Sequence, residues 1–134
     1  MTDTSPDYYK DGPFECILLA EQYSFNVVNM LKYVWRHHDK GHPKQDLEKA
    51  LWYARRAEKN CEAFEPCKRY FRYNRNQETT AIQWPGSDPS TLLQIKGNIS
   101  LTEAEQGFWY ALANTKGAAS IIAALENLIK ETEE

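Results

Sequence analysis

The feature that most constrains the fold is a pair of amphipathic segments between residues 24 and 56, separated by a short turn. In each segment, apolar side chains recur at the three- and four-residue spacing that places them on one face of a helix. In the first segment these are Val27, Val28, Met30, Leu31, Val34 and Trp35, and in the second Leu47, Ala50, Leu51, Ala54 and Ala57. The residues between them, 40–43, include Gly and Pro and are typical of a turn. The pattern therefore predicts a helical hairpin.

The remaining sequence predicts a mainly α-helical domain of about five helices. We expect helices at about residues 13–23, 24–38, 44–60, 103–114 and 118–132. Ser24 is a candidate N-cap for the second of these, and Thr102 followed by Glu105 is the capping-box pattern that begins a helix. Residues 81–84 (AIQW) and 92–95 (LLQI) lie in a segment rich in Gly and Pro, so we expect there a short β-hairpin or a plain loop.

Both helices of the hairpin carry cations away from their apolar stripes. Asn29, Lys32 and Arg36 fall together opposite the first stripe, which suits contact with a phosphate or another anion. Lys49, Trp52 and Arg56 fall together beside the second stripe. An indole between two cations suits stacking on a nucleobase. Alternatively, Trp52 packs on a third element or a partner subunit, and the cations are ordinary solubilising charges.

Charge is distributed unevenly along the chain. The net charge is −3, yet residues 32–75 hold twelve Lys or Arg and six Asp or Glu. A basic middle between acidic ends indicates an anionic ligand, either a nucleotide or a nucleic acid. Cations and aromatic side chains alternate over residues 68–75 (KRYFRYNR), which suits a nucleic-acid or protein interaction module, or a buried aromatic face with Arg at its rim.

Several other classes of site are not indicated. The sequence contains neither the P-loop pattern nor the Gly-rich dinucleotide-binding pattern. His37, His38 and His42 crowd one turn with Asp39, but adjacent helical side chains diverge by about 100°. Histidines at a helix C-terminus also suit the helix dipole, so we predict no metal site. The three cysteines are odd in number and form no CxxC pair, and no apolar run or signal peptide is present, so we expect a cytoplasmic protein without membrane contact.

The order of residues in the first half resembles a family of small phage-encoded proteins of unknown function, which includes the nucleoside-monophosphate kinase of the T-seven coliphage. The family pattern runs P-x-H-Y, then a short helix, then N-x-x-K-Y-x-x-R, a K-G turn, and D-L-x-K-A-x-W-Y. The resemblance covers about residues 5–58. The matching residues include Pro6, Tyr9, Asn29, Lys32, Tyr33, Arg36, Lys40, Gly41, Asp46, Leu47, Lys49, Ala50, Trp52 and Tyr53. Tyr8 stands where the family usually has His, and Val28 where it often has Gly.

This resemblance implies a nucleotide-binding protein, and a (deoxy)nucleoside-monophosphate kinase without a P-loop. Lys32 and Arg36 would be its catalytic cations, with ATP as phosphoryl donor and the need for Mg²⁺ left open. The implied ligand-binding residues are Tyr9, Asn29, Lys32, Tyr33, Arg36, Lys40, Asp46, Lys49, Trp52, Tyr53 and Arg56. A non-catalytic phage protein that sequesters a nucleotide or a host nucleotide signal is the alternative, which the departure at Tyr8 favours.

The expected organisation is a single domain spanning residues 1–134. Within it, residues 5–58 would form the nucleotide-binding helical core, residues 59–100 a basic and aromatic segment with a loop, and residues 101–134 a C-terminal helical pair. Because small domains often complete a site with a neighbouring subunit, we expect a homo-oligomer.

Overall fold

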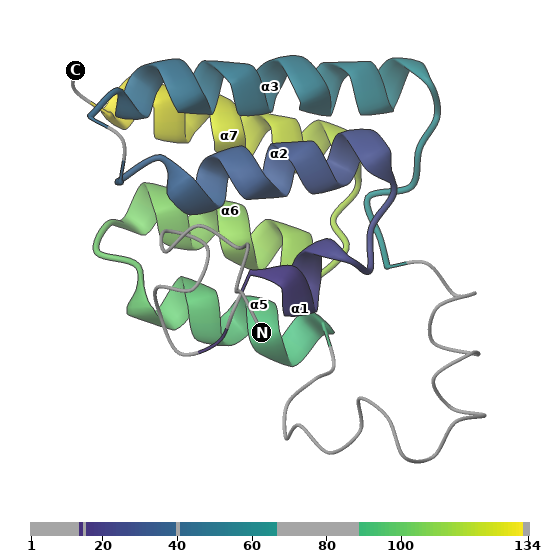
Figure 1. Ribbon diagram of the computed structural model, residues 1–134, viewed down its shortest axis with the longest axis horizontal. Coiled ribbons are helices and arrows are strands. Elements are labelled where there is room, and N and C mark those ends of the chain that lie inside the picture. The colour runs from purple at the N-terminus through teal and green to yellow at the C-terminus, as the bar shows by residue number, and fades with distance from the viewer. Residues whose placement is uncertain (1–13, 15, 40, 67–88, 133–134) are drawn as a thin grey trace, which may run out of the picture.

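The computed structural model describes residue 14 and residues 16–39, 41–66 and 89–132. Six helices make up this described part of the chain (Figure 1). They are α1 (Ile17–Ala20), α2 (Phe25–Arg36), α3 (Pro43–Lys59), α5 (Pro89–Ile99), α6 (Glu103–Ala113) and α7 (Ala118–Glu131). The prediction of a mainly α-helical fold is therefore confirmed. Across these described ranges, no helix has the length and apolar character needed to cross a bilayer.

The helices pack as neighbours in a continuous series. α2 and α3 form the predicted hairpin, α7 lies against α3, and α6 lies between α7 and α5. Figure 1 shows α3, α7 and α2 in the upper part of the molecule, with α6 and α5 below them. Among the described helices, the hairpin is therefore joined to the C-terminal helices through the contact of α3 with α7.

The apolar stripes of the hairpin point into a common core. Val27, Met30, Leu31 and Val34 of α2 are completely buried, and Trp35 is 2% exposed. The Trp35 ring meets the edge of Trp109 from α6, with 6.1 Å between the ring centroids. Each such buried side chain contributes about 1.5–3 kcal/mol through the hydrophobic effect. Because these stripes are buried in the core, the opposite faces of the hairpin helices are directed away from it.

The turn between α2 and α3 has the geometry expected from its sequence. Gly41 has φ +76°, a left-handed conformation that glycine adopts without a steric penalty. Pro43 then begins α3, where its missing N–H costs no helical hydrogen bond. The turn predicted at residues 40–43 is confirmed at Gly41 and His42, whereas Pro43 already belongs to α3 and Lys40 lies outside the described residues.

The prediction of a strand at residues 92–95 is wrong, because these residues belong to α5. The buried positions of this helix are Pro89, Leu92, Leu93 and Gly97. They follow the i, i+3, i+4, i+8 spacing of one helix face. The four-residue run LLQI was too short to distinguish this spacing from that of a buried strand. Residues 81–84, the other expected strand, and the tract at residues 68–75 lie outside the described residues.

The first expected helix is shorter than predicted, and its neighbour is capped differently. α1 ends at Ala20, and the Gln22 side chain donates from Nε2 to the Leu18 carbonyl at 2.7 Å. A side chain that donates to a helix carbonyl competes with backbone N–H groups for that carbonyl oxygen. Ser24 occupies the N-cap of α2, but its hydroxyl donates to Glu62 Oε1 at 2.7 Å. Glu62 also accepts from the Asn26 backbone N–H at 3.1 Å, so its carboxylate caps α2.

Candidate functional site

Five of the predicted site residues meet where α2 and α3 pack together. We call Tyr33, Arg36, Asp46, Lys49 and Tyr53 the hairpin patch. The rings of Tyr33 and Tyr53 stack, with centroids 5.8 Å apart and planes inclined by 15°. Arg36 Cζ lies 4.3 Å from the centroid of the Tyr33 ring, and Lys49 Nζ lies 5.7 Å from it. Two helices thus bring two cations to one aromatic ring, at distances typical of cation–π contacts.

Asp46 and Arg36 form an ion pair within the hairpin patch. Arg36 Nε lies 3.5 Å from Asp46 Oδ2, and the two side chains are 16% and 6% exposed. The expectation that Arg36 projects from a face without packing contacts is therefore wrong. Asp46 lies in the first turn of α3, where the helix dipole favours a carboxylate. This carboxylate holds the guanidinium in place over Tyr33.

Other predicted residues of α2 have different contacts. The Asn29 side chain donates from Nδ2 to the Phe25 carbonyl of its own helix at 2.9 Å. Lys32 is half-buried, and its charge acts on the buried thiol of Cys16. Burial raises the pKa of Cys16 to about 12, and the charges of Lys32 and Lys96 oppose this rise. Tyr9 and Lys40 lie outside the described residues.

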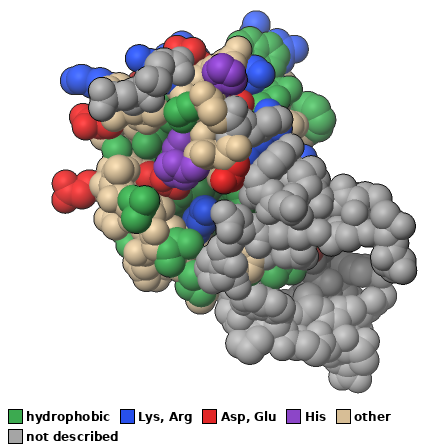
Figure 2. Space-filling view, turned by 60° about the vertical axis from the view of Figure 1, so that its left-hand side comes forward, with side chains coloured by type: hydrophobic (Ala, Val, Ile, Leu, Met, Phe, Trp, Pro, Cys, Tyr) green, Lys and Arg blue, Asp and Glu red, His purple; other side chains and the backbone are tan. Residues whose placement is uncertain are grey.

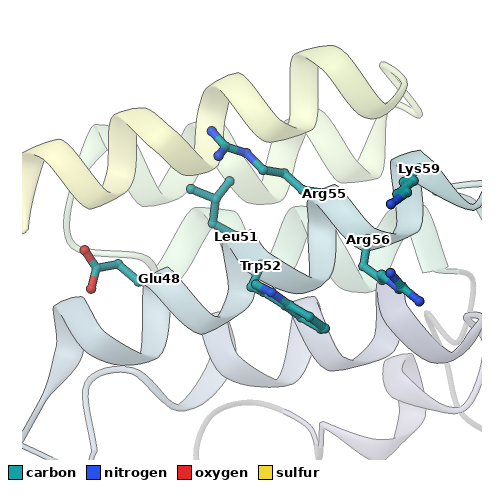
Figure 3. Close-up of a pocket in the computed structure, with 6 residues that line it drawn as sticks. All are labelled: Glu48, Leu51, Trp52, Arg55, Arg56 and Lys59. Atoms are coloured by element: carbon teal, nitrogen blue, oxygen red, sulfur yellow. The ribbon is translucent and has the colours of Figure 1, made fainter.

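Trp52 and Arg56 lie on an adjoining surface of α3. With other side chains of the same helix they line an open hollow (Figure 3), whose volume is about 350 Å³. We call this surface the α3 hollow. Its lining residues are Glu48, Leu51, Trp52, Arg55, Arg56 and Lys59. Trp52 is 61% exposed, and its ring meets Tyr53 edge-on with 5.1 Å between centroids. The α3 hollow therefore adjoins the hairpin patch through Tyr53.

Two features of this surface were missed by the sequence analysis. Arg55 and Lys59 follow Trp52 at three and seven residues, a spacing that places them near it on the helix. Arg55 extends toward α7 and donates to Glu126 Oε2 at 2.5 Å (Figure 3). Phe25 is 70% exposed and lies 6.4 Å from the Tyr53 ring between centroids. The only signal in the sequence was the presence of an aromatic residue, Phe25, at the start of the predicted helix.

A second group of chemically reactive side chains lies at the C-terminal end of α2. We call His37, His38 and Glu105 the His–Glu cluster. Glu105 Oε1 lies 2.7 Å from His38 Nε2 and 4.0 Å from His37 Nε2. The two imidazole centroids are 3.8 Å apart, so the expectation that these side chains diverge is wrong. α2 ends at Arg36, His37 is its C-cap, and His38 lies in the turn that follows.

Neighbouring groups fix the orientation of the His–Glu cluster. His37 Nδ1 lies 2.6 Å from the Val34 carbonyl oxygen. Because a carbonyl can only accept, Nδ1 carries a proton and donates it. Trp109 Nε1 donates to Glu105 Oε2 at 3.0 Å. His37 Nε2 therefore lies on the side of Glu105 Oε1, which also contacts His38 Nε2.

The protonation equilibria of the cluster reflect its burial. Burial lowers the pKa of His37, despite its backbone hydrogen bond. The hydrogen bond with Glu105 raises the pKa of His38. Burial alone would raise the pKa of Glu105, but hydrogen bonds from His38 and Trp109 outweigh it and lower the pKa to about 2. Glu105 is thus an ionised carboxylate although its residue is 3% exposed.

Comparison with known protein families gives a match over the first part of the chain. Residues 4–55 match a protein family described as a protein of unknown function, DUF3310. The hairpin patch lies inside the matched residues, whereas Glu105 of the His–Glu cluster lies beyond them. No curated protein and no solved structure matches the chain. Over residues 4–55, the chain is therefore similar to a family whose description assigns no activity.

Proposed function

We propose that the protein binds a nucleotide on the α2–α3 hairpin. The observation that carries this proposal is the convergence of Arg36 and Lys49 on the stacked rings of Tyr33 and Tyr53. Phosphate is bound best by cations held at fixed positions, and a base is bound best by an aromatic surface. The hairpin patch has both features within residues 33–53.

The two cations have different roles in this proposal. Lys49 is exposed, so its ammonium reaches a phosphate without rearrangement. Arg36 is mostly covered and is oriented by Asp46, so it presents only part of its guanidinium. Hydrogen bonds to charged groups contribute about 1.5–3 kcal/mol each. Loss of either cation should therefore weaken binding about tenfold or more.

Aromatic side chains beside the hairpin patch offer a place for the base. Tyr53 contacts Tyr33 on one side and the edge of Trp52 on another. Trp52 is the most exposed tryptophan in the described part of the chain. Stacking on an aromatic side chain contributes about 1–3 kcal/mol per base and accepts any base. Arg56, which also lines the α3 hollow, would then lie near the base or sugar.

Phosphoryl transfer from ATP to a nucleoside monophosphate is the activity we propose to test at this site. Such transfer requires mainly alignment and neutralisation of phosphate charge, which cations can supply. Lys32 and Arg36, one turn apart on α2, are the proposed catalytic cations. A protein that only sequesters a nucleotide would use the same patch. The sequence tract at residues 68–75 supports a nucleic-acid or protein interaction as a further alternative.

Calorimetric titration with nucleoside monophosphates tests the binding proposal. Lys49→Ala should weaken binding at least tenfold, whereas Lys116→Ala, which removes an equal charge from an exposed loop, should leave binding unchanged. Equal affinity in Lys49→Ala and the unaltered protein would contradict the proposal.

Mass spectrometry of any ligand that co-purifies would identify the base. Light scattering of the same samples measures whether the protein is the expected homo-oligomer.

Product analysis tests the kinase proposal separately. Incubation with each (deoxy)nucleoside monophosphate and ATP, with and without Mg²⁺, should yield the diphosphate, and Lys32→Ala should stop its formation. Nucleotide binding without diphosphate formation under all these conditions would remove the kinase proposal and leave sequestration.

A further inference from the structure

We propose that His37, His38 and Glu105 bind a divalent transition-metal ion such as Zn²⁺ where α2 meets α6. One ligand atom from each of these residues lies within 4.8 Å of the other two. Two imidazoles and a carboxylate are a common protein ligand set for zinc. This site is separate from the hairpin patch, and the proposal does not depend on nucleotide binding.

The distances in the His–Glu cluster fit a metal ion after small side-chain shifts. Zn²⁺ bonds of about 2.0–2.2 Å in a tetrahedron place ligand atoms about 3.3 Å apart. Glu105 Oε1 lies 2.7 Å from His38 Nε2 and 4.0 Å from His37 Nε2, so the observed distances bracket this value. These two distances would each change by less than about 1 Å to reach it, and the separation of the two histidine nitrogens is at most 4.8 Å.

The groups behind the cluster are those that orient metal ligands in proteins. A ligating histidine usually donates its other ring N–H to a carbonyl or carboxylate, which fixes the tautomer and directs the free nitrogen at the metal. His37 has this arrangement through its Nδ1 contact with the Val34 carbonyl. Trp109 fixes Glu105 in the same manner by donating to Oε2. Both of these hydrogen bonds are present in the structure without a bound ion.

An ion pair between His38 and Glu105 does not account for the whole cluster. His37 is 2% exposed, and its Nε2 lies 4.0 Å from Glu105 Oε1, which is beyond hydrogen-bond distance. A metal ion would replace the His38–Glu105 hydrogen bond and give His37 Nε2, His38 Nε2 and Glu105 Oε1 one common partner. Lys96, whose Nζ lies 4.0 Å from the centroid of the Trp35 ring, adds a positive charge nearby that the Glu105 carboxylate offsets.

The cluster is open on one side. The side chain of His38 is 54% exposed, whereas those of His37 and Glu105 are 2% and 4% exposed. Figure 2 shows histidine side chains reaching the surface next to acidic ones. The exposed side gives an ion a path to the cluster and leaves a fourth coordination position for water. Three protein ligands with an open position are typical of catalytic rather than closed structural zinc sites.

Cobalt titration of the full, untagged, chelator-treated chain tests the proposal. Co²⁺ replaces Zn²⁺ in such sites and gives visible absorption bands that report its geometry. We expect saturation at one ion per chain and displacement by Zn²⁺. His38→Asn, at the exposed ligand, should weaken Zn²⁺ binding at least about 100-fold. His42→Asn is the matched control, because His42 is exposed and lies outside the cluster, and it should bind as the unaltered protein does.

A second readout separates a lost ligand from a lost fold. Zn²⁺ should raise the melting temperature of the unaltered protein and of His42→Asn, because a ligand of the native state stabilises it. The melting temperature of His38→Asn should not respond, while its circular dichroism stays helical. Absence of both the cobalt bands and the Zn²⁺ stabilisation would overturn the proposal. Binding that survives His38→Asn and Glu105→Gln but is lost in His42→Asn would place the metal elsewhere and also overturn it.

Discussion

Tyr33 of α2 and Tyr53 of α3 stack across the helical hairpin, with centroids 5.8 Å apart and planes inclined by 15°. This contact sets the relative position of the two helices. It also places Arg36 and Lys49 over the same aromatic ring. The proposed phosphate site therefore depends on the packing of the hairpin. Substitutions of Arg36 and Asp46 at this site have opposite predicted effects on nucleotide binding.

Arg36 and its partner Asp46 should affect nucleotide binding in opposite directions. Arg36→Ala removes a cation and should weaken binding about tenfold or more. Asp46→Asn removes the anion that competes with phosphate for the guanidinium, 3.5 Å away, and should strengthen binding. Calorimetric titration measures both. Weaker binding in Asp46→Asn, in a protein of normal helical content, would show that the orientation of Arg36 by Asp46 matters more to binding than their competition, and would contradict the prediction.

Trp52 should report ligand binding by fluorescence. Its indole is 61% exposed beside the hairpin patch, whereas Trp35 and Trp109 are buried in the core. A base stacked on Trp52 should quench its emission, and Trp52→Phe should abolish that change. Trp35 is buried in the core, so Trp35→Phe is the control and should retain the response. A response unchanged in Trp52→Phe would place the base elsewhere.

Glu62 should stabilise the protein at neutral pH and lose this effect in acid. Burial alone would raise its pKa, but hydrogen bonds from Ser24 and Asn26 outweigh burial and lower it. A carboxyl whose folded pKa is depressed stabilises the fold above its unfolded pKa of about 4.3 and loses that contribution as the pH falls through the folded value. Removing a helix cap costs about 1 kcal/mol. Denaturant unfolding should show Glu62→Gln less stable at pH 7, with a smaller difference at pH 3.

Cys16 should resist alkylation in the folded protein, whereas Cys61 should react. Cys16 is 2% exposed, and burial raises its pKa to about 12, so little thiolate forms at pH 8. Cys61 is exposed and free. Site-resolved mass spectrometry after iodoacetamide treatment measures each thiol. Modification of Cys16 only after addition of denaturant is expected, and equal rates for the two cysteines without denaturant would contradict its burial.

Patterns of neighbouring residues were enough to predict the helices of the hairpin and the last two helices. Their signals are spacings of three and four residues, together with Gly and Pro at the ends, and all of these are local. Thr102 illustrates this, because its side chain accepts from the Glu105 backbone N–H as the capping pattern predicts. The four-residue run at residues 92–95 was too short for its spacing to distinguish helix from strand, so that prediction was wrong.

The candidate site was predicted less completely than the helices. Helical spacing singled out Lys49, whereas Tyr33 and Tyr53 entered the candidate site only through the family resemblance, and the structure brings the three side chains together. Helical spacing could not show that Asp46 would cover part of Arg36, because that contact depends on how α3 is aligned along α2. The ligand-binding role of these residues, which follows from the family resemblance, stays a prediction.

The sequence was sufficient for the helical hairpin because an amphipathic stripe can be buried in essentially one way. Tertiary packing was needed to assign the polar side chains, whose partners lie far away along the chain. Glu105 fits a local capping box, yet its carboxylate bonds Trp109 and also His38, 67 residues earlier. Glu62 caps a helix that begins 37 residues before it. A buried carboxylate takes the strongest donors that packing brings within reach, and no local pattern encodes which donors those are.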